Sequence, residues 1–158
     1  MSYKINKLFY ITILLVSLFS ISSALFVEYV LSIQPCKLCL YQRIPYIFSI
    51  IVCFFGIFFS KNKIWIYFLI IVFISSILIS GYHMGIENNI FNEFSGCTNN
   101  NLNTIDKAEL LQSLNNLLPN CKDVNFKILG LSLATINFLL SIVLFIIIMK
   151  YFNNEKNR

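Results

Sequence analysis

Residues 64–80 read IWIYFLIIVFISSILIS and contain no charged side chain. A helix needs about 20 residues to cross the hydrocarbon core of a membrane, and this run reaches that length if it continues through Gly81–Ile86. Isoleucine, phenylalanine and valine dominate the run without the period-two alternation of a barrel strand. The stretch therefore predicts a membrane-spanning helix over about residues 64–84.

Three further apolar runs lie on either side of this one, at Leu8–Leu31, Ile44–Phe59 and Ile128–Met149. The first and last are long enough to span a membrane alone, and the second reaches the length when extended back into Pro35–Arg43. We expect an all-α membrane protein, a bundle of four transmembrane helices in a single domain covering residues 1–158. The expected spans are about residues 8–31, 40–59, 64–84 and 128–149.

The composition agrees with lipid as the main solvent. Of the 158 residues, 58% are apolar and 12% are charged, and the mean hydropathy is +0.76. Soluble domains carry about 25% charged residues. The net charge of +5 comes from scattered lysines and arginines, so no nucleic-acid partner is expected. The first apolar run is far longer than the core of a signal peptide, which is about 7–15 residues, so we expect it to be retained.

The basic residues predict the orientation. Cytoplasmic loops and ends of membrane proteins are enriched in lysine and arginine, and short loops carry the most weight. The short turn Ser60–Lys63 carries two lysines, and both chain ends are basic, so we expect both termini in the cytoplasm. The residues concerned are Lys4, Lys7, Lys61, Lys63, Lys150, Lys156 and Arg158.

This orientation places four of the five cysteines at the outer surface and leaves only Cys53 inside a span. Two of the four lie in the outer loop of about residues 87–127. Within that loop, Thr104–Leu118 places leucine, isoleucine and alanine at helical spacing, with Thr104 as an N-cap. The pattern predicts a short amphipathic helix on the membrane surface.

The outer pair Cys36 and Cys39 stands in the sequence Gln34-Pro35-Cys36-Lys37-Leu38-Cys39-Leu40-Tyr41-Gln42-Arg43. Pro35 can open a helix, which would put Cys36 at the positive end of the helix dipole. We expect that position to lower the pKa of the Cys36 thiol. Arg43 lies four residues beyond Cys39 on the same helical face, where it can stabilise the Cys39 thiolate. The spacing predicts a redox dithiol with an electrostatic partner.

Other interpretations stay open at this point. Zinc sites also use the Cys-x-x-Cys spacing, so the outer cysteines, with His83, could instead serve a metal-binding or transport protein. Cys97 and Cys121 are 24 residues apart in one loop, where they could form an inert staple or an exchangeable disulfide. A purely structural membrane protein with inert outer disulfides is a third reading.

The sequence resembles one known family. The segments CKLCLYQR at residues 36–43, GYHMGIE at residues 81–87 and GLSLA at residues 130–134 are similar to the DsbB disulfide bond formation proteins of bacterial inner membranes. The order of the cysteines is specific, because the related vitamin K epoxide reductase-like proteins place the Cys-x-x-Cys pair after the loop cysteines. In some DsbB members an acidic residue precedes the arginine, where this chain has Gln42.

The resemblance implies a quinone-dependent thiol oxidase of the inner membrane, with its active cysteines in the periplasm. A reduced DsbA-like thioredoxin-fold protein would attack Cys97 and free Cys121. Cys121 would then exchange with Cys36, and a quinone, ubiquinone or menaquinone, would re-oxidise the pair through Cys39. Quinone contacts are expected from Arg43, His83 and Met84, with His83 suited to relay a proton.

Overall fold

The computed structural model describes residues 2–59, 62–92, 121, 127–128 and 130–156. In these segments it contains four long helices: α1 (Ser2–Tyr29), α2 (Lys37–Phe58), α3 (Ile64–Glu87) and α5 (Leu133–Lys156). Two short antiparallel strands, β1 (Lys127–Ile128) and β2 (Leu131–Ser132), precede α5. The four helices are long and apolar enough to cross a membrane, which confirms the expected all-α membrane bundle. The predicted amphipathic helix Thr104–Leu118 lies outside the described residues.

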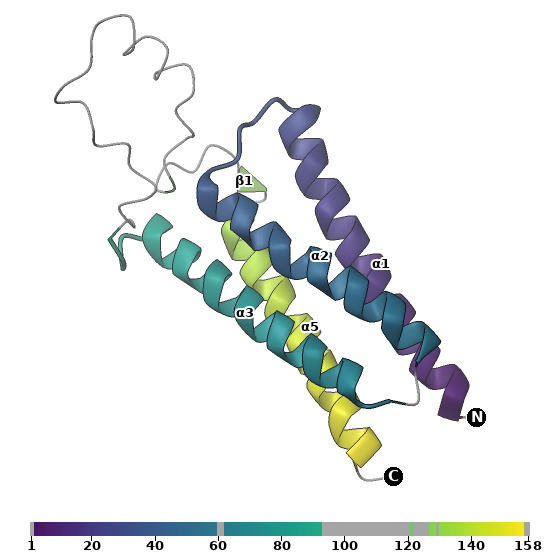
Figure 1. Ribbon diagram of the computed structural model, residues 1–158. Helices are drawn as coiled ribbons and strands as arrows, with labels where there is room; N and C mark the ends of the chain where they lie inside the picture. Colours follow the sequence, from purple (N-terminus) through teal and green to yellow (C-terminus); the bar gives the residue numbers. More distant parts are fainter. Residues whose placement is uncertain (1, 60–61, 93–120, 122–126, 129, 157–158) are drawn as a thin grey trace, which may run out of the picture.

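The helices lie side by side, with both chain ends at one end of the bundle and the start of α2 at the other (Figure 1). Helix α1 packs on α2, α2 on α3, and α3 on α5. Each helix therefore returns in the direction opposite to the one before it. This up-and-down order gathers the α1–α2 connection, the end of α3 and the start of α5 at one end, opposite the termini.

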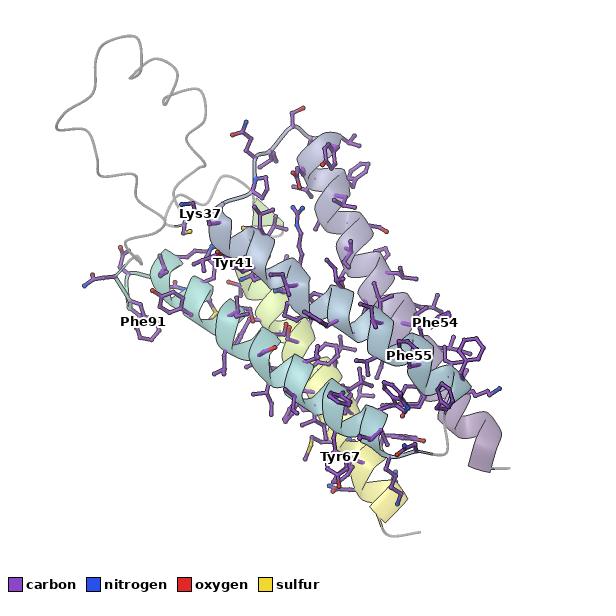
Figure 2. The ribbon with its side chains drawn as sticks, viewed as in Figure 1. Lys37, Tyr41, Phe54, Phe55, Tyr67 and Phe91 are labelled. Carbon is purple, nitrogen blue, oxygen red and sulfur yellow. The ribbon has the colours of Figure 1, made fainter. Side chains whose placement is uncertain are left out.

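The outer surface of the bundle is apolar, as a lipid-facing surface must be. Phe19 is 74% exposed and Leu78 is 67% exposed, and Phe54 and Tyr67 lie at the periphery of the helices (Figure 2). Exposure of this extent would destabilise a soluble protein but suits a hydrocarbon solvent. The interior contains a cluster that includes Tyr10, Tyr46, Cys53, Leu69, Phe73 and Ile148.

Buried hydroxyl groups join neighbouring helices. Ser49 donates a hydrogen bond to Ser17 of α1 over 2.6 Å. Ser76 of α3 and Ser141 of α5 are 2.8 Å apart, and the hydroxyl of Tyr46 lies 3.2 Å from the Ser141 oxygen. Apolar burial contributes little to association in lipid, so small polar residues between helices select the packing partners.

The last helix begins later in the chain than the start of the fourth expected span. The fourth span was placed at residues 128–149, but α5 begins at Leu133 and continues to Lys156. Gly130 adopts a positive φ of 83°, which residues with a side chain rarely adopt, and it lies in the turn between β1 and β2. The Ser132 hydroxyl then accepts a hydrogen bond from the Thr135 backbone N–H and so caps the helix.

Gly56 provides the test of helix packing. A Cβ atom added there would lie 2.6 Å from a ring carbon of the buried Tyr10. We expect Gly56→Ala to destabilise the bundle by about 1–3 kcal/mol through overpacking, although alanine favours helix by about 1 kcal/mol. Thermal unfolding of the purified protein in detergent measures this. Gly81→Ala, whose nearest contact would be 3.1 Å, should cost less, and a Gly56→Ala protein with an unchanged melting temperature would contradict the prediction.

Candidate redox site

The Cys-x-x-Cys pair lies at the start of α2, at the end of the bundle opposite the termini. Cys36 is the N-cap of the helix, and its Sγ accepts a hydrogen bond from the backbone N–H of Cys39. The thiol of Cys36 donates a hydrogen bond to the Sγ of Cys39, and the two sulfurs are 3.1 Å apart. Helix geometry alone therefore holds the two thiols within reach of one another.

The predicted effect of the helix dipole on Cys36 was wrong. The structure raises the pKa of the Cys36 thiol to about 12, chiefly because this thiol donates its hydrogen bond to Cys39 and because it is buried. Donation stabilises the protonated form, and burial disfavours the thiolate. The contact with His83 acts in the opposite direction but is smaller. Cys36 is thus a thiol that needs an acceptor for its proton before it can attack.

His83 of α3 lies directly against this pair. Its Nε2 atom is 3.6 Å from the Cys36 Sγ, and its Nδ1 atom is 3.0 Å from the amide nitrogen of Gln42. The same Nε2 is 3.7 Å from a carboxylate oxygen of Glu87, one helical turn away. The family resemblance indicated His83, but the sequence did not indicate that Gln42 and Glu87 contact it.

Cys121 is the member of the second pair that the structure describes. It is buried and packs in one cluster with Cys36, Leu38 and Ile86, with Cys39 beside them. The family resemblance implied that Cys121 would meet Cys36, although a long loop separates Cys121 from α2 in the sequence. The structure therefore brings together three of the four predicted cysteines. Cys97 lies outside the described residues.

Arg43 has a partner that the sequence did not reveal. Its guanidinium donates a hydrogen bond to the carboxylate of Glu28, from α1, over 2.5 Å. Both side chains are less than a quarter exposed, so the pair is shielded from the solvent that weakens surface ion pairs. The ion pair holds the end of α1 against α2.

These groups share one cavity of about 460 Å³. Its walls include Phe19, Val27, Leu140, Cys36, Cys39, Arg43, His83 and Cys121. Asn137 also lines it, and the Asn137 Nδ2 is buried without a hydrogen-bond partner among the described residues. An apolar cavity with a few polar groups is typical of a small-molecule site. A quinone fits this donor set, because its ring and tail are apolar and its carbonyl oxygens accept hydrogen bonds. Met84 is not part of the cavity wall.

A metal ion is the rival occupant of the dithiol. The ligand atoms of Cys36, Cys39 and His83 all lie within 4.8 Å of one another. Two thiolates on one tetrahedral zinc, however, stand about 3.8 Å apart, given a Zn–S distance of about 2.3 Å. The observed separation of 3.1 Å is shorter. The spacing favours a pair of thiols that exchange with a disulfide.

Comparison with known proteins agrees with this arrangement. A family model described as "Disulfide bond formation protein DsbB" matches residues 6–150. An uncharacterized protein of Rickettsia prowazekii (strain Madrid E) is 30% identical over 150 residues, which cover 91% of this chain and 84% of the relative. The chain belongs to the DsbB family. It is a multi-pass membrane protein of disulfide bond formation, and the family indicates disulfide oxidoreductase activity.

The raised pKa of Cys36 has a measurable consequence. In the reduced protein, we expect alkylation of Cys36 by iodoacetamide to accelerate about tenfold per pH unit from about pH 8 to about pH 10, because only the thiolate reacts. Mass spectrometry of the Cys36 peptide follows the rate. In Cys39→Ser the sulfur that accepts the hydrogen bond of Cys36 is lost, which should lower the Cys36 pKa. The alkylation rate should then begin to level off at lower pH. A plateau below about pH 9 in the unchanged protein would contradict the assignment.

Proposed function

We propose that the protein oxidises the dithiol of a periplasmic DsbA-like thioredoxin-fold protein and transfers the electrons to a membrane quinone. The observation that carries the proposal is the packing of Cys36, Cys39 and Cys121 at the wall of an apolar cavity that also contains Arg43. Sulfurs that must exchange disulfides have to meet, and a lipid-soluble oxidant has to reach them from the membrane.

The orientation is part of the proposal. The termini lie together at the end of the bundle opposite the dithiol (Figure 1), and the basic residues Lys63 and Lys150 flank the spans α3 and α5 at that end. The positive-inside rule puts this end in the cytoplasm. The cysteines then face the periplasm, where disulfides persist. On this assignment residues 1–158 form a single membrane domain.

The exchange steps balance as thiol–disulfide reactions. A partner thiolate attacks Cys97 in the Cys97–Cys121 disulfide, a new S–S bond forms, and Cys121 leaves as the thiolate. Cys121 attacks Cys36 in the Cys36–Cys39 disulfide, and Cys39 leaves in turn. Resolution of the two mixed disulfides restores the loop disulfide, oxidises the partner and leaves Cys36 and Cys39 reduced. The role of Cys97 rests on the family resemblance.

A bound quinone, ubiquinone or menaquinone, supplies the two-electron acceptor that returns Cys36 and Cys39 to the disulfide. Arg43 would donate hydrogen bonds to a carbonyl oxygen, and its fixed charge would favour an anionic Cys39. Glu28 holds the guanidinium in place. The apolar walls would exclude water from the sulfurs. Overall, one dithiol and one quinone give one disulfide and one quinol.

The oxidase can be tested directly with purified protein in detergent. We expect a reduced DsbA-like protein to drive the reduction of ubiquinone or menaquinone, followed by absorbance, at the expense of its own dithiol. Cys36→Ser should abolish quinone reduction, because the pair can no longer close. Cys53→Ser is the matched control, since Cys53 lies fully buried in the core cluster away from the cavity. Equal rates in the protein and in Cys36→Ser would reject the oxidase.

Substitutions of Arg43 and Glu28 should weaken the use of quinone without changing the exchange of disulfides with the partner protein. Loss of a charged hydrogen bond of about 1.5 kcal/mol predicts that Arg43→Met raises the quinone KM about tenfold. Glu28→Gln should act in the same direction but less, because the guanidinium remains. Partner exchange, measured by trapping mixed disulfides without quinone, should stay unchanged in both. Unaltered quinone kinetics in Arg43→Met would remove Arg43 from the quinone site.

A further inference from the structure

The buried contacts around His83 form a connected chain that the exchange steps above do not use. It starts at the Cys36 Sγ, passes through the imidazole and reaches Glu87, whose other carboxylate oxygen accepts a hydrogen bond from Ser132. His83 is 2% exposed and Gln42 is 7% exposed, so bulk water does not supply these partners. Buried polar groups keep such contacts because unpaired ones are costly.

Gln42 decides which ring nitrogen of His83 carries the proton. Its amide nitrogen lies 3.0 Å from Nδ1, an orientation that leaves the ring proton on Nε2, and a half-turn of the amide would present its oxygen to Nδ1 instead. With the oxygen turned to Nδ1, that nitrogen carries the proton and Nε2 offers a lone pair toward Cys36. With the NH₂ group turned to Nδ1, the proton sits on Nε2. A glutamine therefore supports both states of a proton-transferring imidazole.

Glu87 lies where a proton on Nε2 would be stabilised. Its Oε1 is 3.7 Å from that nitrogen, and its side chain is 10% exposed. A carboxylate in this position can accept a hydrogen bond from a protonated Nε2. Ser132, the residue that caps α5, fixes the carboxylate from the other side. The carboxylate is therefore held by α3 and by the start of α5 together.

We propose that His83 is the base that takes the proton of Cys36, with Gln42 and Glu87 as positioning residues. The inference rests on the proposed oxidase and deepens it. When Cys36 closes the disulfide with Cys39, its S–H bond breaks, an S–S bond forms, and the proton goes to His83 Nε2. Two electrons pass to the quinone, and the two thiol protons balance the two that quinol formation requires. The same transfer serves Cys36 in reverse when its disulfide opens.

The surroundings contain few competing groups. Among the described residues, the ionisable side chains near His83 are Cys36 and Cys39 at the start of α2, Glu87 on its own helix, and Cys121, with Arg43, Glu28 and Tyr46 along the same cavity. Arg43 and Glu28 neutralise each other. Among the described residues, His83 is thus the basic group placed to accept the proton of Cys36.

The test uses reduced protein without quinone and follows alkylation of Cys36 at about pH 8.5. His83→Gln should slow it about tenfold, equivalent to one unit of pKa. Glu87→Gln should slow it less, and Glu87→Asp should recover part of the loss. Gln42→Leu should also slow it, whereas Gln42→Glu should not, because a carboxylate still accepts the Nδ1 proton.

Ile86→Val is the matched control, because Ile86 packs in the Cys36 cluster but has no ionisable group that could exchange a proton with Cys36. An equal loss in Ile86→Val, or a rate in His83→Gln indistinguishable from the unchanged protein, would overturn the proposal. If His83→Gln does not fold, the two Gln42 variants provide the test. Equal alkylation rates of Cys36 in Gln42→Leu and Gln42→Glu would then overturn the proposal. Quinone is absent here, so failure of quinone reduction would reject the oxidase without changing this result.

Discussion

The hydrogen bond between two thiols at the first turn of a helix is the interaction on which this site depends. Cys36 occupies the N-cap, so its sulfur contacts both the backbone N–H and the sulfur of Cys39. A single turn of helix therefore fixes the dithiol without help from a loop. The same turn points the following residues, Gln42 and Arg43, toward groups on α3 and α1 respectively.

Among the described residues, the buried dithiol, the histidine and the Arg43–Glu28 ion pair gather at one end of the bundle. Toward the termini, helices meet through aromatic and aliphatic contacts, such as the stacked rings of Phe9 and Tyr151. In the middle, hydroxyl groups of serine and tyrosine join the helices. Near the dithiol, charged and ionisable groups appear in contact with one another. This gradient follows the change from hydrocarbon to water, because charge is tolerated only near the interface or in a pair.

Much of the fold could be predicted from the sequence because it depends on a simple quantity, the length of each apolar run. The cysteines and Arg43 could be selected because their spacing within one helix fixes their separation. The contacts that these residues make with other parts of the fold could not be predicted from spacing alone. Glu28 meets Arg43 from a different helix, and Cys121 reaches Cys36 across a long loop, so both contacts depend on tertiary packing. The pKa of Cys36 was misjudged because a neighbouring thiol and burial outweigh the dipole.

The Ser132 hydroxyl takes part in two hydrogen bonds with different roles. It caps α5 through the Thr135 N–H, and it donates to Glu87 beside His83. The chain that reaches Ser132 comes directly from Cys121 by way of the Gly130 turn. One hydroxyl group therefore both caps α5 and holds the carboxylate beside His83, so a change at the start of α5 also changes the surroundings of the imidazole.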